Sequence, residues 1–154
     1  MTSDGSDQNL SLGVLIYSDR GIAETVELAK LSESLGCNYF WYTDVRFARE
    51  CYVVLGSIAS ATKNILLAPG VTDPYSRHPA LTAVAIATLD EMSNGRAVLG
   101  LGVGAAGFKE LGITPVLPIA AMREAIAVFR GLLTGNEVTV EGKVISLEGG
   151  ALTF

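Results

Sequence analysis

Four apolar runs recur along the chain, and each is followed by a segment with a helical pattern. The runs span residues 12–17, 39–43, 65–68 and 97–103. They consist mainly of aliphatic and aromatic residues, without the alternation of apolar and polar residues that a half-exposed strand shows. Strands of this kind are buried on both faces, in parallel sheets covered by helices. The sequence therefore predicts an α/β protein in which four parallel strands alternate with helices.

Residues that start or stop a helix define the segments between these strands. We expect helices over residues 22–35 and 50–61, and a third from Pro79 to Met92, because proline suits the first turn of a helix. A fourth helix is predicted to bury one apolar face, made of Met122, Ile126, Phe129 and Leu133. Residues 138–145 are predicted to form a peripheral hairpin that turns at Glu141 and Gly142.

The composition describes a core-forming chain and excludes several classes of function. The chain has 154 residues, of which 49% are hydrophobic and 18% charged, and its net charge is -5. It lacks the cluster of lysine and arginine that nucleic acid binding requires. No apolar stretch approaches about 18 residues, and residues 1–8 do not resemble a signal peptide. We therefore expect a cytoplasmic protein that binds neither nucleic acid nor a membrane.

The two cysteines, Cys37 and Cys51, do not form a metal-binding or redox motif. Neither belongs to a Cys-x-x-Cys pair or to a cysteine and histidine cluster with the spacing of metal ligands. We therefore expect two reduced thiols that pack in the interior, and no metal site.

An unusually polar loop, residues 69–79, follows the third predicted strand. Ligands of parallel α/β proteins bind at the carboxyl ends of the strands, so we expect the functional site there. Within the loop, His78 directly precedes the third helix and is predicted to cap or pack rather than to abstract protons. Arg77 is predicted to pair with Asp73 or Asp90; contact with an anionic part of a cofactor is the alternative.

Two architectures fit the alternation of strands and helices: an open doubly wound sheet and part of a (β/α)8 barrel. Residues 102–107, Gly-Val-Gly-Ala-Ala-Gly, match the dinucleotide fingerprint G-x-G-x-x-G of the open sheet. That fingerprint requires a helix that starts within the glycines. Here Gly112, Pro115 and Pro118 interrupt the segment, which favours the barrel.

Four segments carry a specific resemblance to a known family. They are Trp-Tyr-Thr-Asp at residues 41–44, the loop at residues 70–79, and residues 87–96 and 99–104. Together they resemble the luciferase-like monooxygenase superfamily. The loop is similar to that of the branch that uses the deazaflavin coenzyme F420 and includes methylenetetrahydromethanopterin reductase. The resemblance covers nearly everything after Leu10.

The resemblance implies a (β/α)8 TIM barrel that binds a flat tricyclic cofactor at the carboxyl ends of its strands. Because a whole barrel typically needs about 250 residues, we expect only its amino-terminal half here. This half is predicted to span residues 11–154, with the first four βα units and a small β-hairpin, after a flexible segment at residues 1–10. Its open edges and inner face are expected to be covered by a homo-oligomer or by the missing C-terminal half.

The activity that the resemblance implies is hydride transfer between reduced coenzyme F420 and a carbon centre of a small-molecule substrate. The half barrel alone is expected to be inactive. An FMN-dependent monooxygenase of the same superfamily is the first alternative. A non-catalytic half barrel that serves assembly is the second, and it would bind neither cofactor.

The resemblance also assigns roles to residues at the strand ends. Asp44 matches an acidic position near the cofactor, although an N-cap role is the alternative, and Val45 stands where the family often has histidine. Glu110 is the second candidate catalytic acid. Besides Asp44, the expected cofactor-binding residues are Gly70, Val71, Thr72, Gly102, Val103 and Gly104. The family has a non-proline cis peptide at the position of Gly70 and Val71.

Overall fold

The structure, a computed structural model, describes residues 10–104 and 107–154, so most of the predicted N-terminal segment lies outside it. Its central element is a parallel sheet of β1 (Gly13–Ile16), β2 (Tyr39–Tyr42) and β3 (Leu66–Pro69), in that order. Leu15 pairs with Trp41, which in turn pairs with Ala68. The first three predicted strands are thus confirmed to within one or two residues at their ends.

Three helices follow the three strands, close to their predicted bounds. They are α1 (Ile22–Ser34), α2 (Cys51–Ala61) and α3 (Pro79–Ser93). Helix α1 is followed by Gly36, whose φ of 80° ends the helix as expected for glycine at this position. Within the described ranges, no helix is long and apolar enough to cross a membrane.

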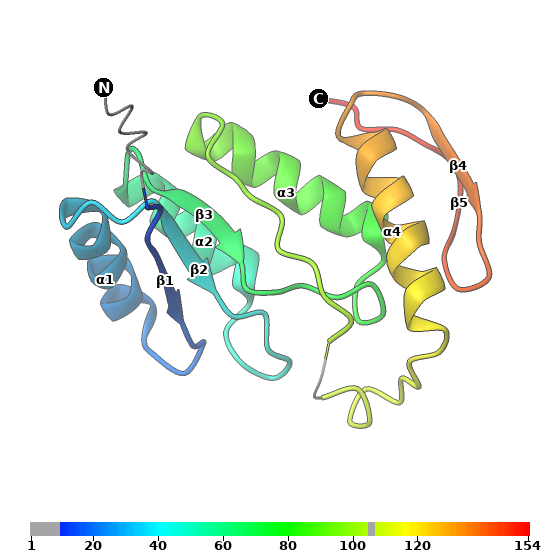
Figure 1. The fold of residues 1–154 in the computed structure, drawn as a ribbon, viewed down its shortest axis with the longest axis horizontal. Helices are drawn as coiled ribbons and strands as arrows, with labels where there is room; N and C mark the ends of the chain where they lie inside the picture. The colour runs from blue at the N-terminus through cyan, green and yellow to red at the C-terminus, as the bar shows by residue number, and fades with distance from the viewer. Residues whose placement is uncertain (1–9, 105–106) are drawn as a thin grey trace, which may run out of the picture.

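The helices cover one face of the sheet. Alternate strand residues, including Phe40, Tyr42 and Leu67, are fully buried in one cluster with residues of α1, α2 and α3. In Figure 1 the helices α1, α2 and α3 lie on one side of the sheet, and its opposite face carries Leu15, which is 49% exposed, and Trp41. A doubly wound sheet has helices on both faces and a reversal in strand order. Sequential strands with helices on one face are the arrangement of a partial barrel.

The fourth predicted strand, residues 97–103, is not a continuous strand. It runs parallel to β3 and meets it at two isolated bridges, Leu67 with Ala97 and Thr72 with Leu101. Between these bridges lies Pro69, which has no N–H group to donate to the neighbouring chain. The predicted direction and neighbour are therefore right, but the predicted length was wrong.

The inner face of the sheet is built from one large side chain against several glycines. Trp41 lies next to Gly13, Gly70 and Gly100, one from each neighbouring strand or strand end. A Cβ atom at these glycines would come within 3.2, 3.3 and 2.8 Å of Trp41, respectively. Tyr39 stacks on the same tryptophan, with ring centroids 6.1 Å apart. Trp41 therefore occupies space that a side chain at Gly13 would need, while Leu15 Cδ1 and the Pro69 carbonyl oxygen are the nearest obstacles at Gly70 and Gly100.

The amino-terminal ends of the strands, called the base here, are held by two charged side chains. Arg96 is 7% exposed and donates to the carbonyl oxygens of four residues, Ala59, Thr62, Ile65 and Ser93, and to the Thr62 hydroxyl. Glu33 of α1 accepts from the backbone N–H groups of residues 63, 64 and 65, at 2.6–2.9 Å. Both side chains bond backbone groups of the turn between α2 and β3, and Arg96 also bonds carbonyl oxygens at the ends of α2 and α3.

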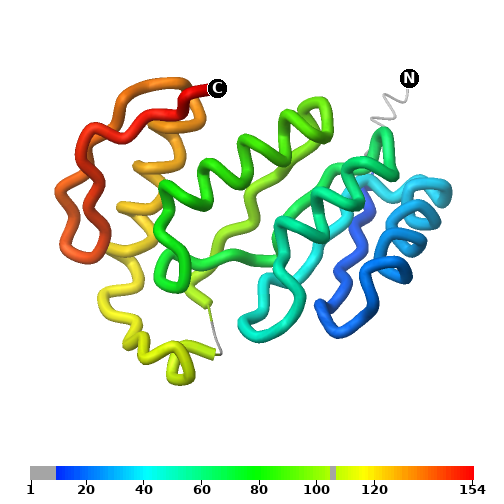
Figure 2. Tube along the Cα trace, turned by 180° about the vertical axis from the view of Figure 1, so that it is seen from behind, coloured from blue at the N-terminus to red at the C-terminus, as the bar shows by residue number. Residues whose placement is uncertain are grey.

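Helix α4 (Pro118–Leu132) packs against α3 and the hairpin of β4 (Val138–Glu141) and β5 (Ser146–Gly150), as Figure 2 shows from behind. Its predicted buried face was wrong except for Phe129. The buried residues are Ala121, Ala125, Val128, Phe129 and Leu132, whereas Ile126 and Leu133 are about 40% exposed. Small alanines form the contact because they let α4 approach α3 closely.

The hairpin turn is also longer than predicted. It spans the residues between Glu141 and Ser146, instead of turning at Glu141 and Gly142. Glu124 of α4 accepts from the N–H groups of residues 143, 144 and 145, at 2.8–3.0 Å, and holds this wider turn. The length of this turn thus depends on a contact with α4, which the local sequence pattern does not indicate.

Candidate functional site

The carboxyl ends of the strands and the chain after Leu101, called the rim here, bring most of the predicted site residues together. Asp44 follows β2 and is half-buried. It is not a helix cap, so that alternative was wrong. Glu50 caps α2 instead, and its carboxylate accepts from the N–H of Val53 at 2.7 Å. Asp44 therefore does not stabilise the start of α2.

The environment of Asp44 favours its protonated form. Burial raises the pKa of Asp44 above its usual range, while the Thr72 hydroxyl and the charge of Arg77 act in the opposite direction. Thr72 is 1% exposed and lies beside both Asp44 and the phenol of Tyr52. Within the described residues, no well-aligned hydrogen bond satisfies Thr72 Oγ1 or Tyr52 Oη. Both oxygens are fully buried, so an internal water molecule, rather than a ligand at the surface, is the partner they could take.

The loop after β3 forms one wall of the rim. The peptide bond between Gly70 and Val71 is cis, at the position where the family resemblance places one. Thr72 continues the pairing with the fourth segment, since its N–H donates to Gly100 O at 3.0 Å and its carbonyl accepts from Gly102 N at 2.9 Å. These backbone bonds hold the loop after β3 beside Gly100 and Gly102.

The second wall consists of the chain at Gly102, Val103 and Gly104. A Cβ atom at Gly102 would approach Val71 Cγ2 to 2.8 Å, so the two walls touch here. Val71 and Val103 are 43% and 44% exposed and present apolar surface. Gly102 and the exposed side chains of Val71 and Val103 form one apolar surface, called the cradle here.

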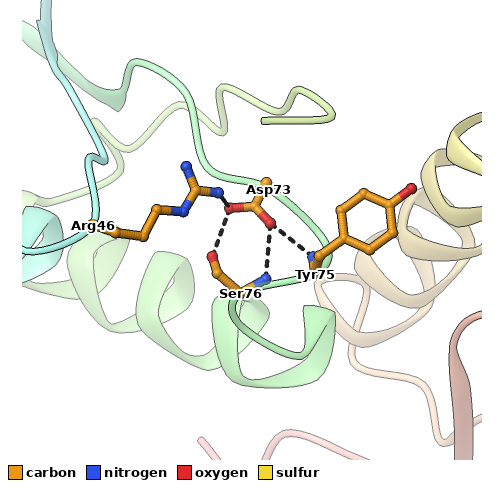
Figure 3. A network of polar contacts seen from close by, with 4 residues as sticks. All are labelled: Arg46, Asp73, Tyr75 and Ser76. Atoms are coloured by element: carbon orange, nitrogen blue, oxygen red, sulfur yellow. Dashed lines mark hydrogen bonds and ion pairs between the residues drawn. The ribbon is translucent and has the colours of Figure 1, made fainter. Parts of the chain in front are cut away.

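A polar network beside these walls centres on Asp73, which is 3% exposed (Figure 3). Its carboxylate accepts from Tyr75 N and Ser76 N, both at 2.8 Å, and from Ser76 Oγ at 2.6 Å. Arg46, from the loop after β2, completes the network with an ion pair to the same carboxylate. Arg46 was not predicted from the sequence, because a charged residue in a loop carries no local signal of its partner.

The predicted partners of Arg77 were wrong. Arg77 pairs with Glu50 at the start of α2 and lies over the ring of Tyr52, 4.8 Å from its centroid. The prediction for His78 is confirmed, since it caps α3 and its Nδ1 accepts from Ala80 N at 3.2 Å. Its Nε2 lies 3.0 Å from Ser146 O of the hairpin.

The remaining candidates lie outside this cluster. Glu110 is exposed in the turn after Phe108. Of the glycine fingerprint, Ala105 and Ala106 lie outside the described residues. Dinucleotide binding requires a helix that starts within the glycines, whereas the next described helix, α4, begins only at Pro118.

The two cysteines are free thiols. Cys51 is fully buried and donates to Tyr42 O at 3.4 Å. Burial raises the pKa of Cys51, so its thiol stays protonated and unreactive. Packing is therefore its role in the described structure.

Chemically, the rim offers an apolar surface and one half-buried carboxyl group. Such a surface can hold a flat apolar ring, and the carboxyl group can orient it. A carboxyl group with a raised pKa can hold a proton near neutral pH more readily than an exposed one. The arrangement suits a site in which a bound cofactor performs the main chemistry.

Comparison with known proteins agrees with this description. The sequence pattern of the luciferase-like monooxygenase family matches residues 5–154. The 5,10-methylenetetrahydromethanopterin reductase of Archaeoglobus fulgidus is 40% identical over 146 residues, which are 94% of this chain and 44% of that protein. The chain thus spans less than half the length of this curated relative.

Solved structures give the same picture. The coenzyme F420 dependent tetrahydromethanopterin reductase of Methanopyrus kandleri matches 94% of this chain and 46% of its own, with a TM-score of 0.89 and 33% identity. The oxygenating constituent of 3,6-diketocamphane monooxygenase from Pseudomonas putida, solved with FMN, matches with a TM-score of 0.78 and 20% identity. The second likeness concerns the fold alone.

Proposed function

Because the chain belongs to the luciferase-like monooxygenase family, we propose that it forms the first half of the barrel of an F420-dependent oxidoreductase. The reaction is hydride transfer between reduced coenzyme F420 and a carbon centre of a small molecule, as in methylenetetrahydromethanopterin reductase. The substrate class is a one-carbon unit carried on a pterin, which is what the names of the similar reductases indicate.

One observation carries this proposal: the structural match to the Methanopyrus kandleri reductase. It combines a TM-score of 0.89 with 33% sequence identity over 94% of this chain. The alternative, an FMN-dependent monooxygenase, is supported by a match of 20% identity. Likeness at that level extends to the fold, so it gives FMN less support than the first match gives coenzyme F420.

The residues of the rim fit a flat redox ring. Gly102 keeps a side chain away from Val71, Gly70 and Gly104 let the backbone of the two walls pack closely on their neighbours, and Val71 and Val103 supply apolar contact. Coenzyme F420, when bound, supplies the hydride chemistry of its deazaflavin ring. The protein residues supply the walls and the exclusion of water, and Thr72, whose hydroxyl is buried beside Asp44, holds the first wall.

Asp44 and Glu110 are the proposed acidic groups. Asp44 would hold a proton or orient the ring, and its raised pKa supports the first of these roles. Glu110 is exposed and would act, if at all, on the substrate side of the site. Asp44 is the stronger candidate because it stands beside Thr72, whereas Glu110 has no such contact with the walls.

The proposal requires that the inner face of the sheet be covered. Leu15 is 49% exposed and Tyr39 and Trp41 are half-buried, which leaves apolar surface on this face. The rest of a barrel, or a second copy of the chain, would cover it. A half barrel that serves assembly alone would have the same face covered and would bind neither cofactor.

Titration with the two cofactors tests the proposal. The protein is mixed with increasing coenzyme F420 or FMN, and binding is followed by absorbance and by quenching of Trp41, the only tryptophan. We expect saturable binding of coenzyme F420 and none of FMN. Tight binding of FMN without coenzyme F420 would establish the alternative, and a stable oligomer that binds neither would establish the assembly module.

A matched pair of variants shows whether binding occurs at the rim. Gly102→Val fills the cradle beside Val71, whereas Gly21→Val adds a side chain where a Cβ atom would meet nothing within 4 Å. The first variant should lose coenzyme F420 binding and the second should keep it. Equal binding by both variants would place the cofactor elsewhere.

A further inference from the structure

Arg46 lies where three loops of the rim meet. It belongs to the loop after β2, pairs with Asp73 of the loop after β3, and its guanidinium lies 4.2 Å from the ring centroid of Phe108, in the chain after Leu101. Only 12% of the Arg46 side chain is exposed. A desolvated cation between a carboxylate and an aromatic ring is held on both sides.

Asp73 fixes Arg46 rather than the reverse. The Asp73 carboxylate already accepts three hydrogen bonds from Tyr75 and Ser76 of its own loop (Figure 3). It therefore keeps its position without Arg46. The ion pair with this carboxylate, by contrast, orients the guanidinium so that it lies over the Phe108 ring.

The chain after Leu101 rests directly on the Arg46 side chain. A Cβ atom at Gly104 would lie 2.9 Å from Arg46 Nη2, and one at Gly107 would lie 3.0 Å from Arg46 Cβ and Cδ. Both glycines have positive φ, 73° and 81°. The backbone can approach the arginine this closely because these residues lack side chains.

Backbone hydrogen bonds hold this part of the chain only as far as Gly102. Gly102 N donates to Thr72 O, and the next backbone bond between described residues is from Leu111 N to Phe108 O, within the following turn. A second attachment lies further on, where Tyr75 donates to Val116 O at 2.9 Å and its ring meets Phe108 edge-on at 5.7 Å. Between Gly102 and this attachment, Arg46 contacts Gly104, and it holds Phe108 together with Tyr75.

We propose that Arg46 is a positioning residue that sets the second wall of the cofactor site. The contact of Arg46 with Gly104 and Phe108 fixes the distance of Val103 and Gly104 from the first wall at Gly70–Thr72. This inference rests on the proposed function for the identity of the ligand, but not for the mechanical role of Arg46. Arg46 itself does not touch the reacting atoms.

Hydrogen exchange of the unliganded protein tests the mechanical role. In Arg46→Met, which keeps the apolar stem but loses the charge and the flat face, amides of residues 107–116 should exchange at least about tenfold faster. Amides of β2 and α2 should keep the exchange rates of the unaltered protein, which shows that the fold is intact. Unchanged exchange in residues 107–116 would overturn the inference, whatever the protein binds.

Cofactor binding tests the consequence. Arg46→Met should raise the dissociation constant for coenzyme F420 about tenfold, which corresponds to about 1.4 kcal/mol. In the complete barrel, the turnover number at saturating cofactor should change less than about threefold, because the reacting groups stay in place. Arg46→Lys keeps the ion pair and loses the stacking face, so it should have an intermediate effect.

Two further variants complete the design. Phe108→Leu should act through the same contact, so combining it with Arg46→Met should add little to Arg46→Met alone. Arg49→Met is the matched control, since Arg49 lies in the same loop but donates to Ser18 O and Asp19 O, away from the second wall. Additive effects, or equal weakening by Arg49→Met, would overturn the inference. Failure of the unaltered protein to bind coenzyme F420 would instead overturn the proposed function, while the exchange data still decide the role of Arg46.

Discussion

The base and the rim of the same sheet use charged side chains in opposite ways. At the base, Arg96 and Glu33 bond almost entirely to backbone groups. At the rim, Arg46 pairs with Asp73 and Arg77 pairs with Glu50, so the charged side chains there join one loop to another. The base therefore stabilises the backbone of the fold, whereas the rim positions its loops relative to one another.

The largest expected effect comes from removing Arg96. Arg96→Met leaves four buried carbonyl oxygens without this donor, and we expect the free energy of unfolding to fall by about 3–5 kcal/mol. Arg46→Met should cost only about 1 kcal/mol, because Asp73 keeps three other donors. Urea unfolding of both variants measures the difference, and equal losses would remove the distinction between base and rim.

The next effect concerns the point where the chain passes from the base to the rim. A Cβ atom at Gly100 would overlap the carbonyl oxygen of Pro69, which cannot rotate away, so Gly100→Ala should cost about 1–3 kcal/mol of unfolding free energy. At Gly102 the Cβ atom would meet only the side chain of Val71, and Gly102→Ala should cost less than about 1 kcal/mol. Thermal unfolding of the two alanine variants compares them. A larger loss at Gly102 would show that the rim is packed as rigidly as the base.

A smaller effect with a defined pH dependence is expected at Glu33. Partial burial acts to raise the pKa of Glu33, but three backbone N–H donors outweigh it, and the pKa lies below its usual range. A lowered folded pKa adds stability above the unfolded pKa of about 4.3, and this stability is lost as the pH falls through the folded value. Glu33→Gln should therefore cost about 1 kcal/mol at pH 7 and progressively less below about pH 4.3. A cost that is the same at every pH would show that the charge of Glu33 has no part in it.

The smallest effect on stability is expected at Asp44, with the opposite sign. Because burial raises the pKa of Asp44, its ionisation works against folding, and the loss develops as the pH rises through the folded pKa. Asp44→Asn should raise the free energy of unfolding by a few tenths of a kcal/mol at pH 7. In the complete barrel, the same variant should lower hydride transfer about tenfold to a hundredfold if Asp44 holds a proton. Lower stability at pH 7 would show that Asp44, like Glu33, belongs to the structural framework.

The sequence predicts the layers of this fold better than the contacts between its loops. Apolar runs such as residues 39–43 predict buried parallel strands, because the apolar type of each residue already indicates that it is buried. The length of the fourth strand was wrong because Pro69, on the neighbouring chain, breaks the ladder. The buried face of α4 was wrong because alanines pack against α3 there, and alanine carries a weak hydrophobic signal.

For the candidate site, the sequence predicts the position of a residue best where that residue directly follows a strand. Asp44, Gly70 and Gly102 reach the rim because strand ends in a parallel sheet share one edge. The family resemblance added the cis peptide at Gly70, which spacing alone does not indicate. Arg46 was missed and Arg77 was paired wrongly, because ion pairs between loops depend on how the loops fold in three dimensions.

Trp41 has a consequence for how this protein tolerates change over evolutionary time. Its indole is the nearest neighbour of Gly13, whereas Leu15 and the Pro69 carbonyl oxygen lie closest to Gly70 and Gly100. A larger residue at position 13 should therefore be accommodated most readily where position 41 has become smaller, while positions 70 and 100 gain nothing from that change alone. Natural relatives are expected to exchange volume between positions 13 and 41 as a pair.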